Sequence, residues 1–169
     1  ALRRLQRHRG RRAPLKSTAP GARLASLMGA HDRTVFRQDE IEDWMRVAHA
    51  AAELAYSPYS RIKVGAALVA ADGTVYSGCN VENASYGLTI CAERNAVFRA
   101  VAAGERRFKA VAIATDRPGA LFPCGACRQV LAEFAPELPV FTQGRSSEIA
   151  RSTLAELLPK AFLPKDLES

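Results

Sequence analysis

The chain has 169 residues, of which 48% are hydrophobic and 24% charged, a balance typical of a globular domain and not of a disordered or fibrous protein. No apolar run approaches the roughly 20 residues that a membrane-spanning helix needs, so we expect a soluble protein without a membrane partner. The net charge of +7 arises in residues 1–31, which hold eight Arg and Lys and no acidic residue. From Asp32 onward 16 basic residues face 17 acidic ones, which argues against a folded surface for nucleic acid.

Residues 1–37 are predicted to be a basic, disordered N-terminal extension, and residues 38–169 a single folded domain. Pro14, Pro20 and Gly21 interrupt the extension, and it has little apolar patterning. An organellar targeting segment and a nucleic-acid arm are the alternatives for it. We therefore expect a cytoplasmic protein, with organellar targeting as the second hypothesis.

Helical and strand patterns alternate through the rest of the chain. Asp39 followed by Glu42 predicts a capped helix start, and apolar residues then recur at helical spacing over residues 41–55. Two strands are predicted around the turn Ala71-Asp72-Gly73, and a polar loop follows them. The predicted ranges in chain order are strands at 64–70 and 74–79, a helix at 91–103, a strand at 108–115, a helix at 125–134, a strand at 140–142 and a helix at 153–158. This order predicts a mixed sheet covered by helices.

Four cysteines lie in the central part of the domain: Cys79, Cys91, Cys124 and Cys127. In a reducing compartment, clustered cysteines bind metal more often than they form disulfides. The segments Cys91-Ala92-Glu93-Arg94 and Pro123-Cys124-Gly125-Ala126-Cys127 each open a predicted helix, which would direct three sulfurs toward one point. Three protein ligands with one open position are typical of catalytic zinc, whereas four ligands are typical of structural zinc.

Two hypotheses for the metal site remain open from the spacing alone. Cys79 could supply a fourth sulfur and close a structural site. Glu93, two residues after Cys91, favours a catalytic site, because a structural zinc has no use for a carboxylate and burying one beside thiolates is costly.

Five segments together resemble the small, single-domain, homotetrameric cytidine deaminases. Zinc deaminases share an H-x-E…P-C-x-x-C signature, in which Cys91 here takes the place of the His. The resemblance covers roughly Asp39 to Asp166, and the matching segments are Val64-Gly65-Ala66-Ala67-Leu68, Cys79-Asn80-Val81-Glu82-Asn83-Ala84, Cys91-Ala92-Glu93-Arg94, Pro123-Cys124-Gly125-Ala126-Cys127-Arg128-Gln129 and Leu157-Leu158-Pro159 with Phe162. It implies a cytidine-deaminase-like α/β/α sandwich with a mixed five-stranded sheet flanked by helices.

The resemblance also implies roles for individual residues. One Zn²⁺ per subunit is held by Cys91, Cys124 and Cys127, and Glu93 is the catalytic proton shuttle. The implied substrate contacts are Asn80 and Glu82 to the ribose hydroxyls, and Ala84, Tyr86 and Phe162 at active sites shared between subunits of a homotetramer. Ile62 stands where the family usually has a Phe against the pyrimidine ring, which puts the base preference in question.

Three thiolates on one Zn²⁺ leave a formal charge of −1, which must be offset for the metal to acidify water. The helix N-termini that carry the ligands each act as roughly +0.5 charge. Arg94 and Arg128, each next to a ligand, are expected to donate hydrogen bonds to the sulfurs.

The predicted activity is therefore hydrolytic deamination of cytidine, and of deoxycytidine, to uridine and ammonia in pyrimidine salvage. Two alternatives stand beside it. One is a deaminase of another cytosine-containing nucleoside or antibiotic, and the other is a non-catalytic, zinc-stabilised binding module.

Overall fold

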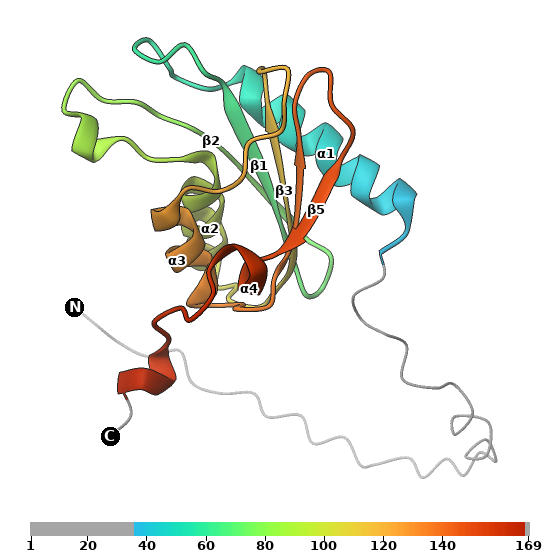
Figure 1. Ribbon diagram of the computed structural model, residues 1–169, viewed down its shortest axis with the longest axis vertical. Helices are drawn as coiled ribbons and strands as arrows, with labels where there is room; N and C mark the ends of the chain where they lie inside the picture. The colour runs from blue at the N-terminus through green and yellow to red at the C-terminus, as the bar shows by residue number, and fades with distance from the viewer. Residues whose placement is uncertain (1–35, 168–169) are drawn as a thin grey trace, which may run out of the picture. The chain divides into compact units, whose positions relative to one another are not determined.

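The computed structural model describes residues 36–167 (Figure 1). The predictions for residues 1–35 lie outside this range, so of the expected N-terminal extension only Phe36 and Arg37 are described. Within the described range, no helix is long and apolar enough to cross a bilayer.

Five strands form one mixed sheet in the order β2-β1-β3-β4-β5. Only the β3–β4 pair is parallel, and the β1–β2, β1–β3 and β4–β5 pairs are antiparallel. The strands are β1 (Val64–Ala70), β2 (Val75–Cys79), β3 (Phe108–Thr115), β4 (Pro139–Gln143) and β5 (Ala150–Thr153). This arrangement confirms the predicted mixed five-stranded sheet.

Helices cover both faces of the sheet, because the central strands bury side chains on both sides (Figure 1). Along β1, Ala67 and Val69 pack on the face covered by α1 (Gln38–Glu53). The alternate residues Ala66 and Leu68 pack on the opposite face. That second face is covered by α2 (Ala92–Ala102), α3 (Gly125–Ala132) and the short α4 (Leu154–Leu157).

Two glycines allow helices to lie directly on strands. A Cβ atom at Gly65 of β1 would be 2.0 Å from the Ala48 carbonyl oxygen of α1. A Cβ atom at Gly78 of β2 would be 2.4 Å from the Ala92 carbonyl oxygen at the start of α2. Gly78 therefore fixes how closely the first turn of α2 approaches the sheet.

The prediction for the start of α1 was wrong by two residues. The helix is capped at Arg37, whose backbone N–H donates to the Glu40 carboxylate at 3.2 Å, and Asp39 lies inside the first turn. Helical spacing over residues 41–55 predicts six apolar residues on one face, and five of them are buried: Ile41, Trp44, Met45, Ala48 and Ala52. The sixth, Ala55, lies beyond the end of the helix.

The C-terminal region contains elements that the sequence did not predict. Strand β5 has no apolar alternation, and it forms because Ala150 to Thr153 pair with β4. Thr153 ends this strand and caps α4, accepting a hydrogen bond from the Glu156 backbone N–H at 3.3 Å. Two 3-10 turns, Tyr86–Leu88 and Pro164–Leu167, were also not predicted.

Candidate metal centre and substrate site

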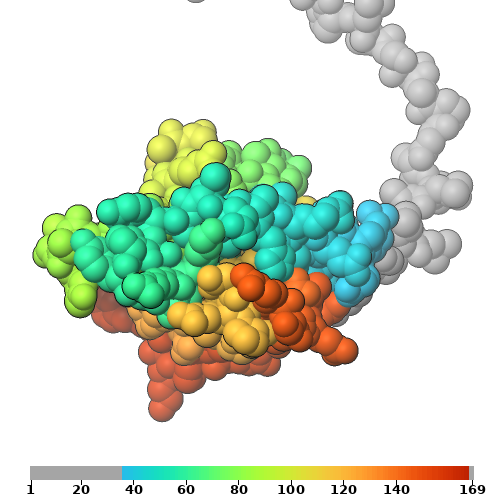
Figure 2. Space-filling model, turned by 90° about the horizontal axis from the view of Figure 1, so that it is seen from above, coloured from blue at the N-terminus to red at the C-terminus, as the bar shows by residue number. Residues whose placement is uncertain are grey.

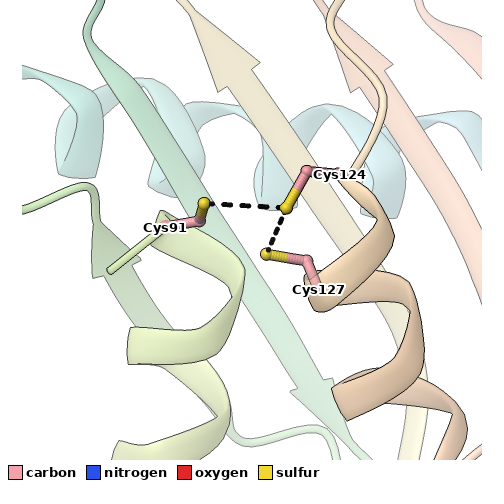
Figure 3. A group of neighbouring side chains, drawn as sticks. All are labelled: Cys91, Cys124 and Cys127. Carbon is pink, nitrogen blue, oxygen red and sulfur yellow. Dashed lines mark hydrogen bonds between the residues drawn. The ribbon is translucent and has the colours of Figure 1, made fainter. Parts of the chain in front are cut away.

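Three cysteine sulfurs converge where α2 and α3 begin (Figure 3). Cys91 is the N-cap of α2, Cys124 is the N-cap of α3, and Cys127 lies in the first turn of α3. The Sγ–Sγ distances are 3.8 Å from Cys91 to Cys124 and 3.5 Å from Cys124 to Cys127, and all three sulfurs lie within 4.8 Å of one another. Tetrahedral Zn²⁺ with Zn–S bonds of about 2.3 Å requires sulfurs about 3.8 Å apart. The three cysteines therefore fit a zinc ion with one coordination position left for another ligand.

The cluster favours a thiolate at Cys91. A hydrogen bond from the Cys127 thiol lowers the pKa of Cys91 to about 5, with a further contribution from Arg94. The same bond raises the pKa of Cys127, which is fully buried. Since a metal binds the thiolate form of cysteine, Cys91 is favoured as a ligand, whereas Cys127 must release its proton when a cation binds.

Arg94 lies against the ligands as predicted. Its guanidinium donates to Cys91 Sγ at 3.7 Å and to the Thr89 carbonyl oxygen at 3.1 Å. Its Nε is buried and has no partner within the described part of the chain. Arg94 therefore places a positive charge beside a cluster that carries a formal charge of −1 once zinc is bound.

Arg128 differs from the prediction, since it donates to no ligand sulfur. Its Nε donates to the Pro123 carbonyl oxygen and its Nη1 to the Leu157 carbonyl oxygen, both at 2.7 Å. The chain just before Cys124 and the end of α4 offer the backbone acceptors that the guanidinium binds. Arg128 thus supports the ligand segment through its backbone.

Glu93 lies in the first turn of α2 and is 4% exposed. Burial raises the pKa of its carboxyl group to about 7. A hydrogen bond from its own backbone N–H opposes the shift, while the Cys91 thiolate adds to it. A carboxyl group with this pKa can both accept and donate a proton near neutral pH.

Cys79 does not belong to the cluster. Its half-buried thiol, at the end of β2, donates to the Leu54 carbonyl oxygen at 3.5 Å. All four cysteines of the chain lie in the described range, and only the other three come together. The geometry therefore contradicts a structural site closed by four cysteines.

Asn80 and Glu82 both bind the backbone of the loop before β1. The Asn80 side chain, 8% exposed, accepts from the Val64 N–H at 2.8 Å and donates to the Ile62 carbonyl oxygen at 2.9 Å. Glu82 accepts from the backbone N–H groups of Tyr59 and Ser60, at 2.9 and 3.2 Å, and from the Ser60 hydroxyl. The hydroxyl bond is the main cause that lowers the pKa of Glu82, which keeps it ionised.

A hollow of about 360 Å³ lies beside these groups, lined by Tyr59, Ser60, Glu82, Tyr86 and Thr89. The rings of Tyr59 and Tyr86 meet edge to face with centroids 5.7 Å apart. The sequence did not single out Tyr59 or Ser60, since their bonds to Glu82 span more than 20 residues and leave no local pattern.

The remaining predicted substrate residues lie at the surface of the single chain. Ile62 is half-buried, and Ala84 is exposed. The side chains of Tyr86 and Phe162 are 73% and 60% exposed. Their contacts with other subunits stay predictions.

Comparison with known proteins agrees with the metal site. The family model of the cytidine and deoxycytidylate deaminase zinc-binding region matches residues 38–142, a range that contains the three clustered cysteines and Glu93. The chain belongs to this deaminase family. Zinc is therefore the metal that the cluster holds.

Individual relatives extend the similarity over most of the folded domain. A cytidine deaminase of Sporosarcina psychrophila is 50% identical over 129 residues, 76% of this chain and 95% of the relative. A crystal structure of cytidine deaminase from Burkholderia pseudomallei matches with a TM-score of 0.69 and 50% identity, over 72% of this chain and 98% of that one. The cytidine deaminase structure from Mycobacterium tuberculosis matches with a TM-score of 0.64 and 43% identity, over 72% and 95%.

Proposed function

We propose that this chain catalyses the zinc-dependent hydrolytic deamination of cytidine, and of deoxycytidine, to uridine and ammonia in pyrimidine salvage. The observation that carries the proposal is Glu93, a buried carboxyl group with a pKa near neutrality beside three sulfurs at zinc-binding distances. The 50% identity to proteins named cytidine deaminase supports the choice of substrate.

Hydrolytic deamination adds water at C4 of the pyrimidine ring and releases ammonia. Zinc held by the three cysteines supplies the Lewis acidity that makes water a competent nucleophile at neutral pH. Glu93 accepts one proton of the water and passes it to ring N3. It then takes the proton of the hydroxyl group added at C4 and delivers it to the amine, which leaves as ammonia. Arg94 and the N-termini of α2 and α3 offset the negative charge of the three thiolates.

Asn80 and Glu82 are proposed to bind the ribose with the hydrogen-bonding capacity that the loop leaves free. The Asn80 amide makes two bonds to backbone and retains one N–H and one acceptor position. An ionised Glu82 accepts from hydroxyl groups and repels phosphate, which favours a nucleoside over a nucleotide.

Assembly and location belong to the same proposal. A homotetramer with active sites shared between subunits would cover exposed apolar side chains such as Tyr86, Leu88 and Phe162. A cytoplasmic location accords with a metal site made of thiols, which a reducing compartment protects from oxidation.

One observation keeps a second enzymatic candidate open. Ile62 offers an apolar wall without the aromatic ring that the family usually has at this position, so another cytosine-containing nucleoside is the alternative substrate. The non-catalytic binding module has less support, because Cys79 lies outside the metal cluster.

The proposal is tested by following the absorbance change as purified protein converts cytidine to uridine. Glu93→Gln preserves the size of the side chain and removes its acid–base function, so we expect a loss of at least about 10²–10⁴-fold in kcat with zinc retained. Glu133→Ala, an exposed position at the end of α3, is the control and should leave the rate unchanged. A zinc-loaded protein that deaminates no cytosine nucleoside, or a fully active Glu93→Gln variant, would refute the assignment.

A further inference from the structure

Ser60 connects two parts of the proposed substrate site. The segment 54–63 and the loop that contains residues 81–90 lie side by side, as the space-filling view shows (Figure 2). Ser60 joins them, because its hydroxyl donates to Glu82 Oε1 and accepts a hydrogen bond from the Ile62 backbone N–H at 3.0 Å. One hydroxyl group thus touches both the carboxylate proposed for the ribose and the residue proposed for the base.

Hydrogen bonds within the chain occupy most of the acceptor positions of the Glu82 carboxylate. Oε2 accepts the backbone N–H groups of Tyr59 and Ser60, which uses its two lone-pair positions. Oε1 accepts the Ser60 hydroxyl and keeps one lone-pair position. The Ser60 hydroxyl therefore determines which direction on Glu82 is left for a sugar hydroxyl.

Ile62 is held at both ends of its backbone. Its N–H donates to the Ser60 hydroxyl, and its carbonyl oxygen accepts from the Asn80 amide at 2.9 Å. The side chain itself is half-buried. A displacement of Ser60 would therefore move two residues together: Ile62, which is proposed to contact the base, and Glu82, which is proposed to accept the ribose hydroxyls.

We propose that Ser60 is a positioning residue that aligns Glu82 with Ile62, so that binding of the sugar hydroxyls and placement of the base depend on each other. The inference rests on the proposed deaminase function and assigns a determinant of substrate specificity to it. Ser60 makes cytidine a better substrate than an analogue without ribose hydroxyls.

The test compares cytidine with 2′,3′-dideoxycytidine, which lacks the hydroxyls that Glu82 and Asn80 would bind. In Ser60→Ala, we expect the ratio of kcat/KM for cytidine to kcat/KM for the dideoxy analogue to fall about 10-fold, mainly through a higher KM for cytidine. Ser60→Thr retains the hydroxyl and should preserve the ratio. Ser57→Ala is the matched control, since Ser57 lies in the same loop and its hydroxyl makes no hydrogen bond among the described residues.

The outcomes separate the inference from the function on which it rests. An unchanged ratio in Ser60→Ala, or an equal loss on both substrates, would overturn the positioning role and leave the deaminase assignment intact. A wild-type protein that converts neither substrate would instead remove the proposed function. Should Ser60→Ala fail to fold, Ser60→Cys provides the same comparison, because a thiol of similar size is a poor hydrogen-bonding group and should also lower the ratio.

Discussion

Replacing Gly78 with Ala tests whether close packing of α2 on β2 positions a zinc ligand. The added Cβ atom would lie 2.4 Å from the Ala92 carbonyl oxygen and 2.5 Å from the Ala96 nitrogen, where ordinary contacts begin at 3.4 Å. Both obstructing atoms are backbone, so α2 must move by about 1 Å. Cys91 is the N-cap of this helix, and Zn–S distances tolerate only about 0.2 Å, so the displacement should open the ligand triangle.

Gly78→Ala is expected to have two effects: a lower stability of the whole domain and a weaker hold on zinc. Overpacking of this kind costs about 1–3 kcal/mol, which for a chain of this length lowers Tm by roughly 2–12 °C. The local effect is faster loss of zinc to a chelator, which a colorimetric zinc indicator measures at a temperature where the protein remains folded by circular dichroism.

Two control variants distinguish the loss of stability from the faster release of zinc. Gly65→Ala creates an even closer clash, 2.0 Å from the Ala48 carbonyl oxygen, but it lies under α1, which carries no zinc ligand. We expect it to lower Tm and to keep the zinc release rate of the folded wild-type protein. Gly87→Ala has nothing within 4 Å of the new Cβ and should change neither quantity. Wild-type zinc release in Gly78→Ala, or equally rapid release in folded Gly65→Ala, would refute the link between α2 packing and Cys91.

The remaining predictions concern the cysteines that bind zinc and the apolar side chain of Ile62, which is proposed to contact the pyrimidine base. Cys124→Ala should reduce zinc from one equivalent per chain to well below half, whereas Cys79→Ala should retain it, because the Cys79 thiol donates to the Leu54 carbonyl oxygen and lies outside the metal cluster. Metal analysis of the two dialysed variants decides this, and equal zinc content in both would contradict the three-cysteine site. Ile62→Phe should lower KM for cytidine roughly 5-fold, the effect of about 1 kcal/mol for a well-placed aromatic contact. A higher KM in steady-state assays would mean that the pocket is built around the smaller side chain.

Local sequence patterns predicted the elements with strong apolar periodicity. The bounds of β1 and β3 agree with the predicted ranges, because continuous apolar runs end at a turn or at a charged residue. Strand β5 was missed since its residues carry no such pattern and its position is defined by pairing with β4. The start of α1 was misplaced because Asp39 is a more typical N-cap residue than Arg37, and only the fold shows that the Glu40 carboxylate accepts the Arg37 backbone N–H.

The sequence by itself determined the chemistry of the metal centre. The C-x-x-C spacing and the Cys-Ala-Glu segment each stand at a helix start, and their resemblance to the zinc deaminases implied three sulfur ligands and a catalytic carboxyl group. The tertiary structure decided which residues support that chemistry. It excluded Cys79 from the cluster, directed Arg128 to backbone carbonyls and brought Ser60 to Glu82. These contacts join segments that lie far apart in the chain or depend on how a loop packs, so only the packed sheet and helices bring the partners within hydrogen-bonding distance.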